Sequence, residues 1–148
     1  MRGAIALAGL ALTIVAFNAA AADAGQIKTA QGRVEIVRGG QHIAAVPGTY
    51  VRQSDSIVTG KDGTVGVTLA DNSRLSIGPN TVMSLDKYAF DTTTYKGRMD
   101  ASLKKGTMVV ISGKLVKQTP GSMRIHTPAS VMGVRGTRFI VHVGKPAS

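Results

Sequence analysis

The residues best suited to chemistry are two arginines set close together around a glycine, in the segment Arg135-Gly136-Thr137-Arg138. A guanidinium group binds carboxylates and phosphates through paired hydrogen bonds, so Arg135 and Arg138 are candidates for an anion site. The same segment fits a structural corner. There Gly136 adopts a backbone conformation closed to other residues, and Arg135 caps carbonyl groups or pairs with an aspartate. Of the two interpretations, the corner is the favoured one.

The corner interrupts an apolar, strand-like stretch of the chain. Successive side chains of a strand point to opposite faces of the sheet. Met132 and Val134 have one parity, whereas Phe139 and Val141 have the other. Either the core lies on different sides before and after the corner, or the chain absorbs an odd residue near Gly136.

Positive charge is concentrated in the second half of the chain. Residues 23–86 carry six basic and six acidic side chains, whereas residues 87–148 carry eleven basic and two acidic ones, a net charge of +9. Such an asymmetry attracts polyanions and acidic partners. The candidate binding residues are Lys104, Lys105, Lys114, Lys117, Arg135 and Arg138. The alternative is a basic surface on which these side chains are scattered without a site.

Enzyme chemistry has little support in the sequence. There is no cysteine, and the three histidines, His42, His126 and His142, lack the spacing of metal ligands. No glycine-rich phosphate loop opens a helix. We therefore expect no catalytic residue, no cofactor and no metal. The few aromatic side chains also argue against a nucleic-acid partner.

The first 24 residues are typical of a secretory signal peptide. Arg2 precedes an apolar run over residues 4–17, and small residues follow, with cleavage expected after Ala22 or Ala24. A retained membrane anchor is the alternative, but this run is shorter than the ~20 apolar residues of a spanning helix. The prediction is a periplasmic or secreted protein whose mature form, residues 25–148, has no transmembrane span.

Composition predicts an all-β fold. The chain of 148 residues has 18 glycines and a single glutamate, Glu35, which disfavours helices. With 43% hydrophobic but only 4% aromatic residues, the core must be aliphatic. Short alternating segments separated by turn formers begin at residues 33–37 and recur along the chain.

The clearest periodicity lies between residues 64 and 88. Apolar pairs recur every eight residues, separated by the turns 71–73 and 78–80. Both a meander of short strands and a stacked coil explain this step. Either arrangement buries the same side chains, namely Val67, Leu69, Leu75, Ile77, Met83 and Leu85.

Beyond Tyr88 the pattern predicts an exposed loop or edge strand over residues 91–100. Strands are then expected around Leu103, over residues 108–111, at Leu115 and Val116, and over residues 123–127. Pro128 cannot donate to a sheet ladder and therefore marks a strand end.

Two stretches resemble the two signature halves of the FecR periplasmic domain family. The first half matches at Thr59, Gly60, Leu69, Asp71, Ser73, Leu75, Ile77, Pro79 and Asn80. The second half matches at Thr127, Pro128, Ala129, Val134, Arg135, Gly136, Thr137 and Phe139. Asn72 replaces the usual glycine, and asparagine also tolerates the left-handed turn conformation. The resemblance extends over residues 32 to 143.

The resemblance implies an extracytoplasmic all-β domain, either a short β-helix-like roll or a rolled antiparallel sheet. The best-known members pass a signal from an outer-membrane transporter for iron chelates to a cytoplasmic sigma factor. This sequence shows no N-terminal cytoplasmic helical domain, so the anti-sigma role is not expected. The motif residues Asp71, Asn72, Ser73, Pro79, Pro128, Arg135, Gly136, Thr137 and Phe139 are expected to maintain the fold.

Together these features predict an exported binding or sensing module that recognises a protein or ligand in the cell envelope. The alternative is a structural envelope component that self-associates or binds anionic envelope polymers. The sequence leaves the identity of the partner, a link to iron, and the oligomeric state open.

Overall fold

The computed structural model describes residues 3, 9 and 23–144. Apart from Gly3, Gly9, Asp23 and Ala24, the predicted signal peptide therefore lies outside the described residues. Twelve strands and one short helix make up the described part of the chain. The strands are β1 (Asp23–Gln31), β2 (Val34–Arg38), β3 (Gln41–Ala44), β4 (Tyr50–Arg52), β5 (Ser56–Thr59), β6 (Thr64–Leu69), β7 (Arg74–Ile77), β8 (Val82–Phe90), β9 (Gly97–Ile111), β10 (Met123–His126), β11 (Val131–Gly133) and β12 (Arg138–Val143), and the helix is α1 (Lys114–Gln118).

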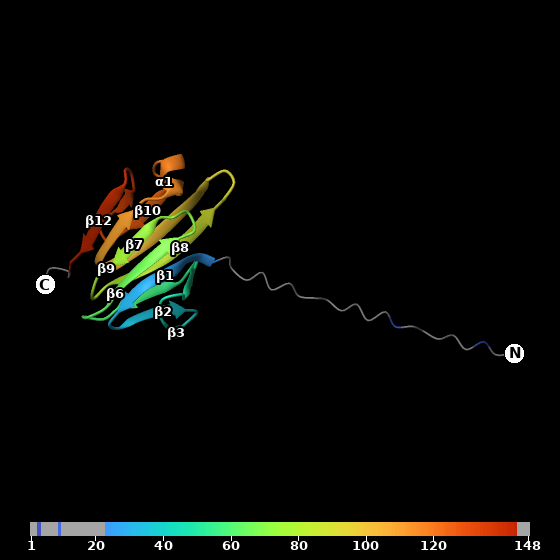
Figure 1. Ribbon diagram of the computed structural model, residues 1–148, viewed down its shortest axis with the longest axis horizontal. Helices are drawn as coiled ribbons and strands as arrows, with labels where there is room; N and C mark the ends of the chain where they lie inside the picture. Colours follow the sequence, from blue (N-terminus) through green and yellow to red (C-terminus); the bar gives the residue numbers. More distant parts are fainter. Residues whose placement is uncertain (1–2, 4–8, 10–22, 145–148) are drawn as a thin grey trace.

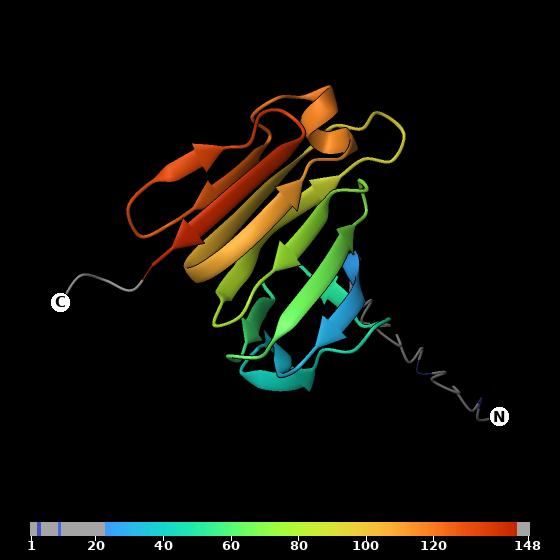
Figure 2. The ribbon, with the colours of Figure 1, turned by 60° about the vertical axis from the view of Figure 1, so that its left-hand side comes forward.

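The strands form one strongly curled sheet whose two halves share β9 (Figures 1 and 2). We call β4-β1-β6-β7-β9-β12 the first half-sheet and β3-β2-β5-β8-β9-β10-β11 the second. Every pair is antiparallel except β9–β10. Of the two predicted arrangements, the rolled antiparallel sheet is therefore the one observed, and the all-β fold class is confirmed.

β9 joins the two half-sheets because it bends at Gly106. Residues 97–105 pair with β8, whereas residues 106–111 pair with β7 and β12. Gly106 has a φ of +100°, and a Cβ atom there would lie 2.1 Å from Oγ1 of Thr81. That hydroxyl accepts a hydrogen bond from the backbone N–H of Thr107 at 3.1 Å. Only glycine allows this bend.

The core lies between the curled half-sheets and is aliphatic, as the composition predicts. All six residues of the eight-residue periodicity are at most 2% exposed, which confirms that prediction. The meander interpretation holds for β6 and β7, which form a hairpin in the first half-sheet. The next strand, β8, passes to the second half-sheet and pairs with β5 and β9.

Beyond β8 the structure agrees with some of the predicted elements and differs from others. The predicted exposed loop is confirmed for residues 91–96, a hairpin loop in which the ring of Tyr95 stacks on that of Phe90 at the end of β8. The prediction is wrong for residues 97–100, which begin β9 and pair with β8, because Met99 and Asp100 are buried there and pair with β10 as well. The strand predicted at Leu115 and Val116 is wrong, because these residues lie in α1. β10 ends at His126, so Pro128 follows a strand end as predicted.

The arginine-glycine corner carries the chain from one half-sheet to the other. β11 pairs with β10 in the second half-sheet, whereas β12 pairs with β9 in the first, so the change of parity reflects a change of sheet. Gly136 has a φ of +84°, and its carbonyl oxygen accepts a hydrogen bond from the hydroxyl of Ser112. The corner interpretation is confirmed for Gly136, but no bulge within a single strand is present there.

The role predicted for Arg135 in that corner is wrong. Its side chain is exposed and makes neither a hydrogen bond nor an ion pair with any of residues 23–144. Arg135 therefore does not cap the corner.

Within the part of the chain that the structure describes, no helix has the length and apolar character needed to cross a bilayer.

Candidate functional site

The Asp71-Asn72-Ser73 turn is a buried structural joint. Asp71 connects β6 to β7 and is 0% exposed. One carboxylate oxygen, Oδ1, accepts hydrogen bonds from the N–H of Ser73 at 3.2 Å and the hydroxyl of Tyr88 at 3.2 Å. Asn72 has a φ of +66°, the left-handed conformation that its place in the motif predicts. The predicted turn aspartate is thereby confirmed.

The other carboxylate oxygen of Asp71 holds α1. Oδ2 accepts from the hydroxyl of Ser73 at 2.6 Å and from the N–H of Leu115 at 3.1 Å. The hydroxyl of Ser73 also accepts from the N–H of Gly113 at 2.9 Å. These bonds use backbone N–H groups that a strand would offer to a neighbour. The segment after β9 is therefore helical, and Leu115 becomes buried.

Tyr88 completes this joint from the second half-sheet. Its hydroxyl donates to Asp71 and accepts from the backbone N–H of the same residue at 3.1 Å. Burial is the largest cause that raises the pKa of Tyr88, and the negative charge of Asp71 raises it further. Tyr88 therefore stays protonated and keeps its donor, which fits a structural role.

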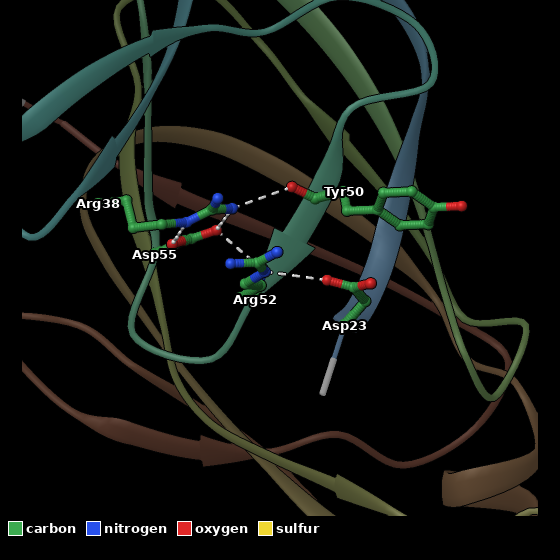
Figure 3. Close-up of polar contacts among 5 residues, drawn as sticks. All are labelled: Asp23, Arg38, Tyr50, Arg52 and Asp55. Atoms are coloured by element: carbon green, nitrogen blue, oxygen red, sulfur yellow. Dashed lines mark hydrogen bonds and ion pairs between the residues drawn. The ribbon is translucent and has the colours of Figure 1, made fainter. Parts of the chain in front are cut away.

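A second polar cluster lies beside this joint, at the start of β1, where the carbonyl oxygen of Ala24 accepts a hydrogen bond from the N–H of Ala70 (Figure 3). Arg38 binds Asp55 through two parallel hydrogen bonds, at 2.9 Å from Nε and 2.8 Å from a terminal nitrogen. Asp55 also accepts from the N–H of Arg52, whose side chain reaches Asp23 at 3.0 Å. The hydrogen bond to Asp55 is the largest cause that raises the pKa of Arg38. The cluster links β1, β2 and β4.

Each acidic side chain of residues 23–144 accepts a hydrogen bond from within that part of the chain. Asp23, Glu35, Asp55 and Asp100 form ion pairs, and Asp71 is enclosed by donors. Among the described arginines, Arg74, Arg124, Arg135 and Arg138 have no carboxylate of residues 23–144 within 4 Å. Positive charge on these four side chains is therefore available to an external group.

Two of these arginines lie on the outer face of the first half-sheet. Arg74 on β7 and Arg138 on β12 are both paired in register with Ile111 of β9. Residues directly opposite one another share a face, and neighbouring strands lie about 4.8 Å apart, so the two arginines stand about 10 Å apart across Ile111. No acidic residue occurs in β6, β7, β12 or residues 106–111 of β9.

Two further sets of residues lie level with one another across this face. Ser76 and Ile140 lie opposite Val109, and His142 lies opposite Thr107. Ile140 is 61% exposed, the largest exposure among the exposed large hydrophobic side chains of the described chain. We call the set of Arg74, Ser76, Ile111, Val109, Arg138, Ile140, Thr107 and His142 the outer face.

Shallow hollows run along the outer face toward β1. Two of them, of 320 and 340 Å³, share Thr29, Gly66 and Ser76 as lining residues. The hollows depend on the absence of a side chain at Gly66, because a Cβ atom there would lie 2.6 Å from Oγ1 of Thr29. Lys28 and Arg74 line the second hollow, so its border is basic.

The six predicted binding residues fall in three places. Lys104 and Lys105 precede the bend of β9, and Lys105 lines a hollow of 550 Å³ together with His142. Lys114 and Lys117 belong to α1. Arg135 and Arg138 lie in and after the corner.

The structure does not gather these residues into one cluster. Residues 106–111 separate the first lysine pair from α1 by about 20 Å at the rise of an extended strand. Lys114 lies over the ring of Tyr95, with Nζ 4.8 Å from the centroid. Only Arg138 stands on the outer face.

Sequence reasoning missed Arg74. The residue belongs to the half of the chain that is neutral in charge, so the net charge of the segments gave no reason to select it. A signal was present, because Leu75 and Ile77 point inward and alternation then turns Arg74 and Ser76 outward. Alternation within one strand does not predict how β7, β9 and β12 pair, and this pairing is what brings Arg74 level with Arg138.

The chain matches a known protein family. A family described as FecR protein matches residues 55–148. The chain belongs to the FecR family. No curated protein and no solved structure matches it. The match begins later than the resemblance over residues 32 to 143, so β1, β2, β3 and β4 precede the matched part.

Several motif residues of this FecR protein have structural roles. Asp71 and Ser73 hold α1, and Gly136 turns the chain between half-sheets. The family is associated with signalling and sensing in general. Along the chain, the outer-face residues of β7 and β9 lie between these two joints, and those of β12 follow Gly136.

Replacing Asp71 with asparagine is expected to destabilise the FecR domain. In asparagine, an NH₂ group replaces one of the two carboxylate oxygens and faces groups that are themselves hydrogen-bond donors. Those donors lose their acceptor, and a buried polar group left unpaired costs about 1–3 kcal/mol. The free energy of unfolding, measured by urea titration, reports this loss. Asp86→Asn is the matched control, since Asp86 is exposed and bonds to serine hydroxyls.

The control is expected to lie within about 0.5 kcal/mol of the parent protein. Equal stability of Asp71→Asn and Asp86→Asn would contradict the assignment of Asp71 as the joint between β6, α1 and β8.

Proposed function

We propose that this FecR protein is exported and acts in the cell envelope by binding an acidic surface of a protein partner. Its mechanism is recognition, without a catalytic step or a cofactor. The observation that carries the proposal is the outer face, where Arg74 and Arg138 flank Ile111 and no carboxylate of residues 23–144 lies within 4 Å of either guanidinium group.

Charge and shape of the outer face both support a protein partner. Basic groups without internal partners attract acidic surfaces and orient the encounter. The exposed side chain of Ile140 adds an apolar contact beside the row of the two arginines. A protein offers an apolar and an acidic group at fixed spacing, whereas a simple anion uses only the charge.

The alternative function, adherence to anionic envelope polymers, draws on the same net charge. It is favoured by the position of the lysines in separate places, on β9 and on α1, because a flexible polyanion can contact several patches. The two functions differ in what they require. A protein partner depends on the outer face, whereas a polymer responds to total charge and to salt.

Export rests on the predicted signal peptide, and the structure favours one of its two cleavage sites. Ala24 is buried, and its carbonyl oxygen accepts a hydrogen bond from Ala70 at 2.9 Å. Asp23 pairs with Arg52. Cleavage after Ala22 leaves both contacts intact, whereas cleavage after Ala24 removes them.

The mature protein is therefore expected to begin at Asp23. Intact-mass measurement of the protein recovered from cells that export it reads the first residue directly. A mass that corresponds to a start at Gly25, or to a chain that keeps residues 1–22, would contradict this prediction.

Site-specific photocrosslinking in intact cells tests the partner. A photoreactive residue at Ser76 lies on the outer face, and the same residue at Asp86 on β8 serves as the control. Ser76 is expected to yield one discrete protein adduct that Asp86 does not yield. Reversing the charge with Arg74→Glu and Arg138→Glu is expected to abolish the adduct while the protein level is unchanged.

Other outcomes would overturn the proposal. Equal adducts from both positions, or an adduct that survives charge reversal, would show that the outer face is not the binding surface. Crosslinks to heterogeneous envelope polymer alone would favour the alternative function.

A further inference from the structure

Within residues 23–144, the edge of β12 that faces away from β9 is free. β12 pairs only with β9 in the described chain, so its other edge has no partner strand there. It has six residues, whereas β3, β4 and β11, which also pair on one side only, have four, three and three. Proteins usually blunt such edges with charged side chains, above all lysine, with proline, with a bulge or by keeping the strand short. The charged side chain of β12 is Arg138 at its first position; the strand contains no lysine or proline, and its register with β9 has no shift.

The register determines which backbone groups point to this edge. The N–H of Ser112 donates to the carbonyl oxygen of Thr137 at 2.8 Å, so this pair is hydrogen-bonded. In an antiparallel ladder such pairs alternate with non-bonded ones. Phe139 and Val141 therefore bond to β9. The N–H and C=O groups of Arg138, Ile140 and His142 point away from β9, toward the free edge.

The side chains of the same three residues lie on the outer face. An arriving strand that pairs with their backbone would place its own side chains next to Arg138, Ile140 and His142. An aliphatic side chain on the arriving strand would pack against Ile140 in the central position. A carboxylate on that strand would pair with Arg138, and Arg74, which is level with Arg138 across Ile111, adds a second positive charge.

We infer that β12 accepts an added β-strand from the partner, an extended segment with an aliphatic residue flanked at two-residue spacing by acidic residues. The inference rests on the proposed function and specifies how the acidic partner binds. Main-chain hydrogen bonds would supply affinity, and the alternate side chains would supply selectivity. The segment would extend the first half-sheet beyond β12.

A second copy of this chain fits the edge less well. Two antiparallel β12 strands centred on Ile140 would bring no carboxylate to Arg138, because β12 has none. Each chain carries a formal net charge of +10, so approach of two copies is opposed by their charge. Charge complementarity therefore selects an acidic segment of another protein.

The probe for this site is the capped peptide Ser-Glu-Val-Ile-Val-Glu-Ser. Its near-symmetry places a glutamate beside Arg138 in either strand direction when its isoleucine lies beside Ile140. Binding to the processed full-length protein is measured by fluorescence anisotropy of a labelled peptide. The peptide is expected to bind, and a version with lysine in place of glutamate is expected to bind at least tenfold more weakly.

Backbone methylation distinguishes strand addition from side-chain docking. One peptide is N-methylated at isoleucine and the other at the two valines, so that each blocks one set of alternate N–H groups. Strand addition predicts at least a tenfold loss for one of the two only. Loss at isoleucine indicates antiparallel pairing, and loss at the valines indicates parallel pairing.

Three results would overturn the inference. They are failure of the peptide to bind, equal effects of the two methylation patterns, and formation of a dimer of this chain that the peptide does not disrupt. The Ser76 crosslinking experiment is independent of them. If its adduct persists and depends on charge while the peptide fails, strand addition is wrong and the proposed acidic partner stands.

Discussion

The bend of β9 at Gly106 is the constraint on which the rest of the domain depends. A strand that stayed straight would remain in the second half-sheet and leave β7 and β12 without a common neighbour. The bend requires a positive φ and the absence of a side chain next to Thr81. Because β9 passes into the first half-sheet there, Arg74 and Arg138 meet on either side of Ile111.

Two further joints hold the strands on either side of this bend. Asp71 uses both carboxylate oxygens to tie the turn after β6 to α1 and to Tyr88. Gly136 lets the chain cross from β11 to β12. Three of the motif residues lie at these joints, Asp71 and Ser73 at the first and Gly136 at the second. Arg74 and Ile140, on the strands of the outer face, are not among the motif residues.

Local patterns predicted much of this fold because they act over short distances. The eight-residue step identified the inward side chains from Val67 to Leu85, and turn formers marked most strand ends. The helix at Leu115 was not predictable from its neighbours, because its N–H is bound by Asp71, 44 residues earlier in the chain. The outer face was hidden for the same reason: the register of β7, β9 and β12 is a long-range property. Net charge of segments pointed instead to lysines that the fold separates.

Amide hydrogen exchange along β12 in the unbound protein tests the central claim most directly, which is that a bent β9 holds β12 on one side and leaves its other edge open. The account predicts alternation, with slow exchange at Phe139 and Val141 and fast exchange at Arg138, Ile140 and His142. Slow exchange at all five amides would mean that the edge is already covered. Fast exchange at all five would mean that β9 does not hold β12.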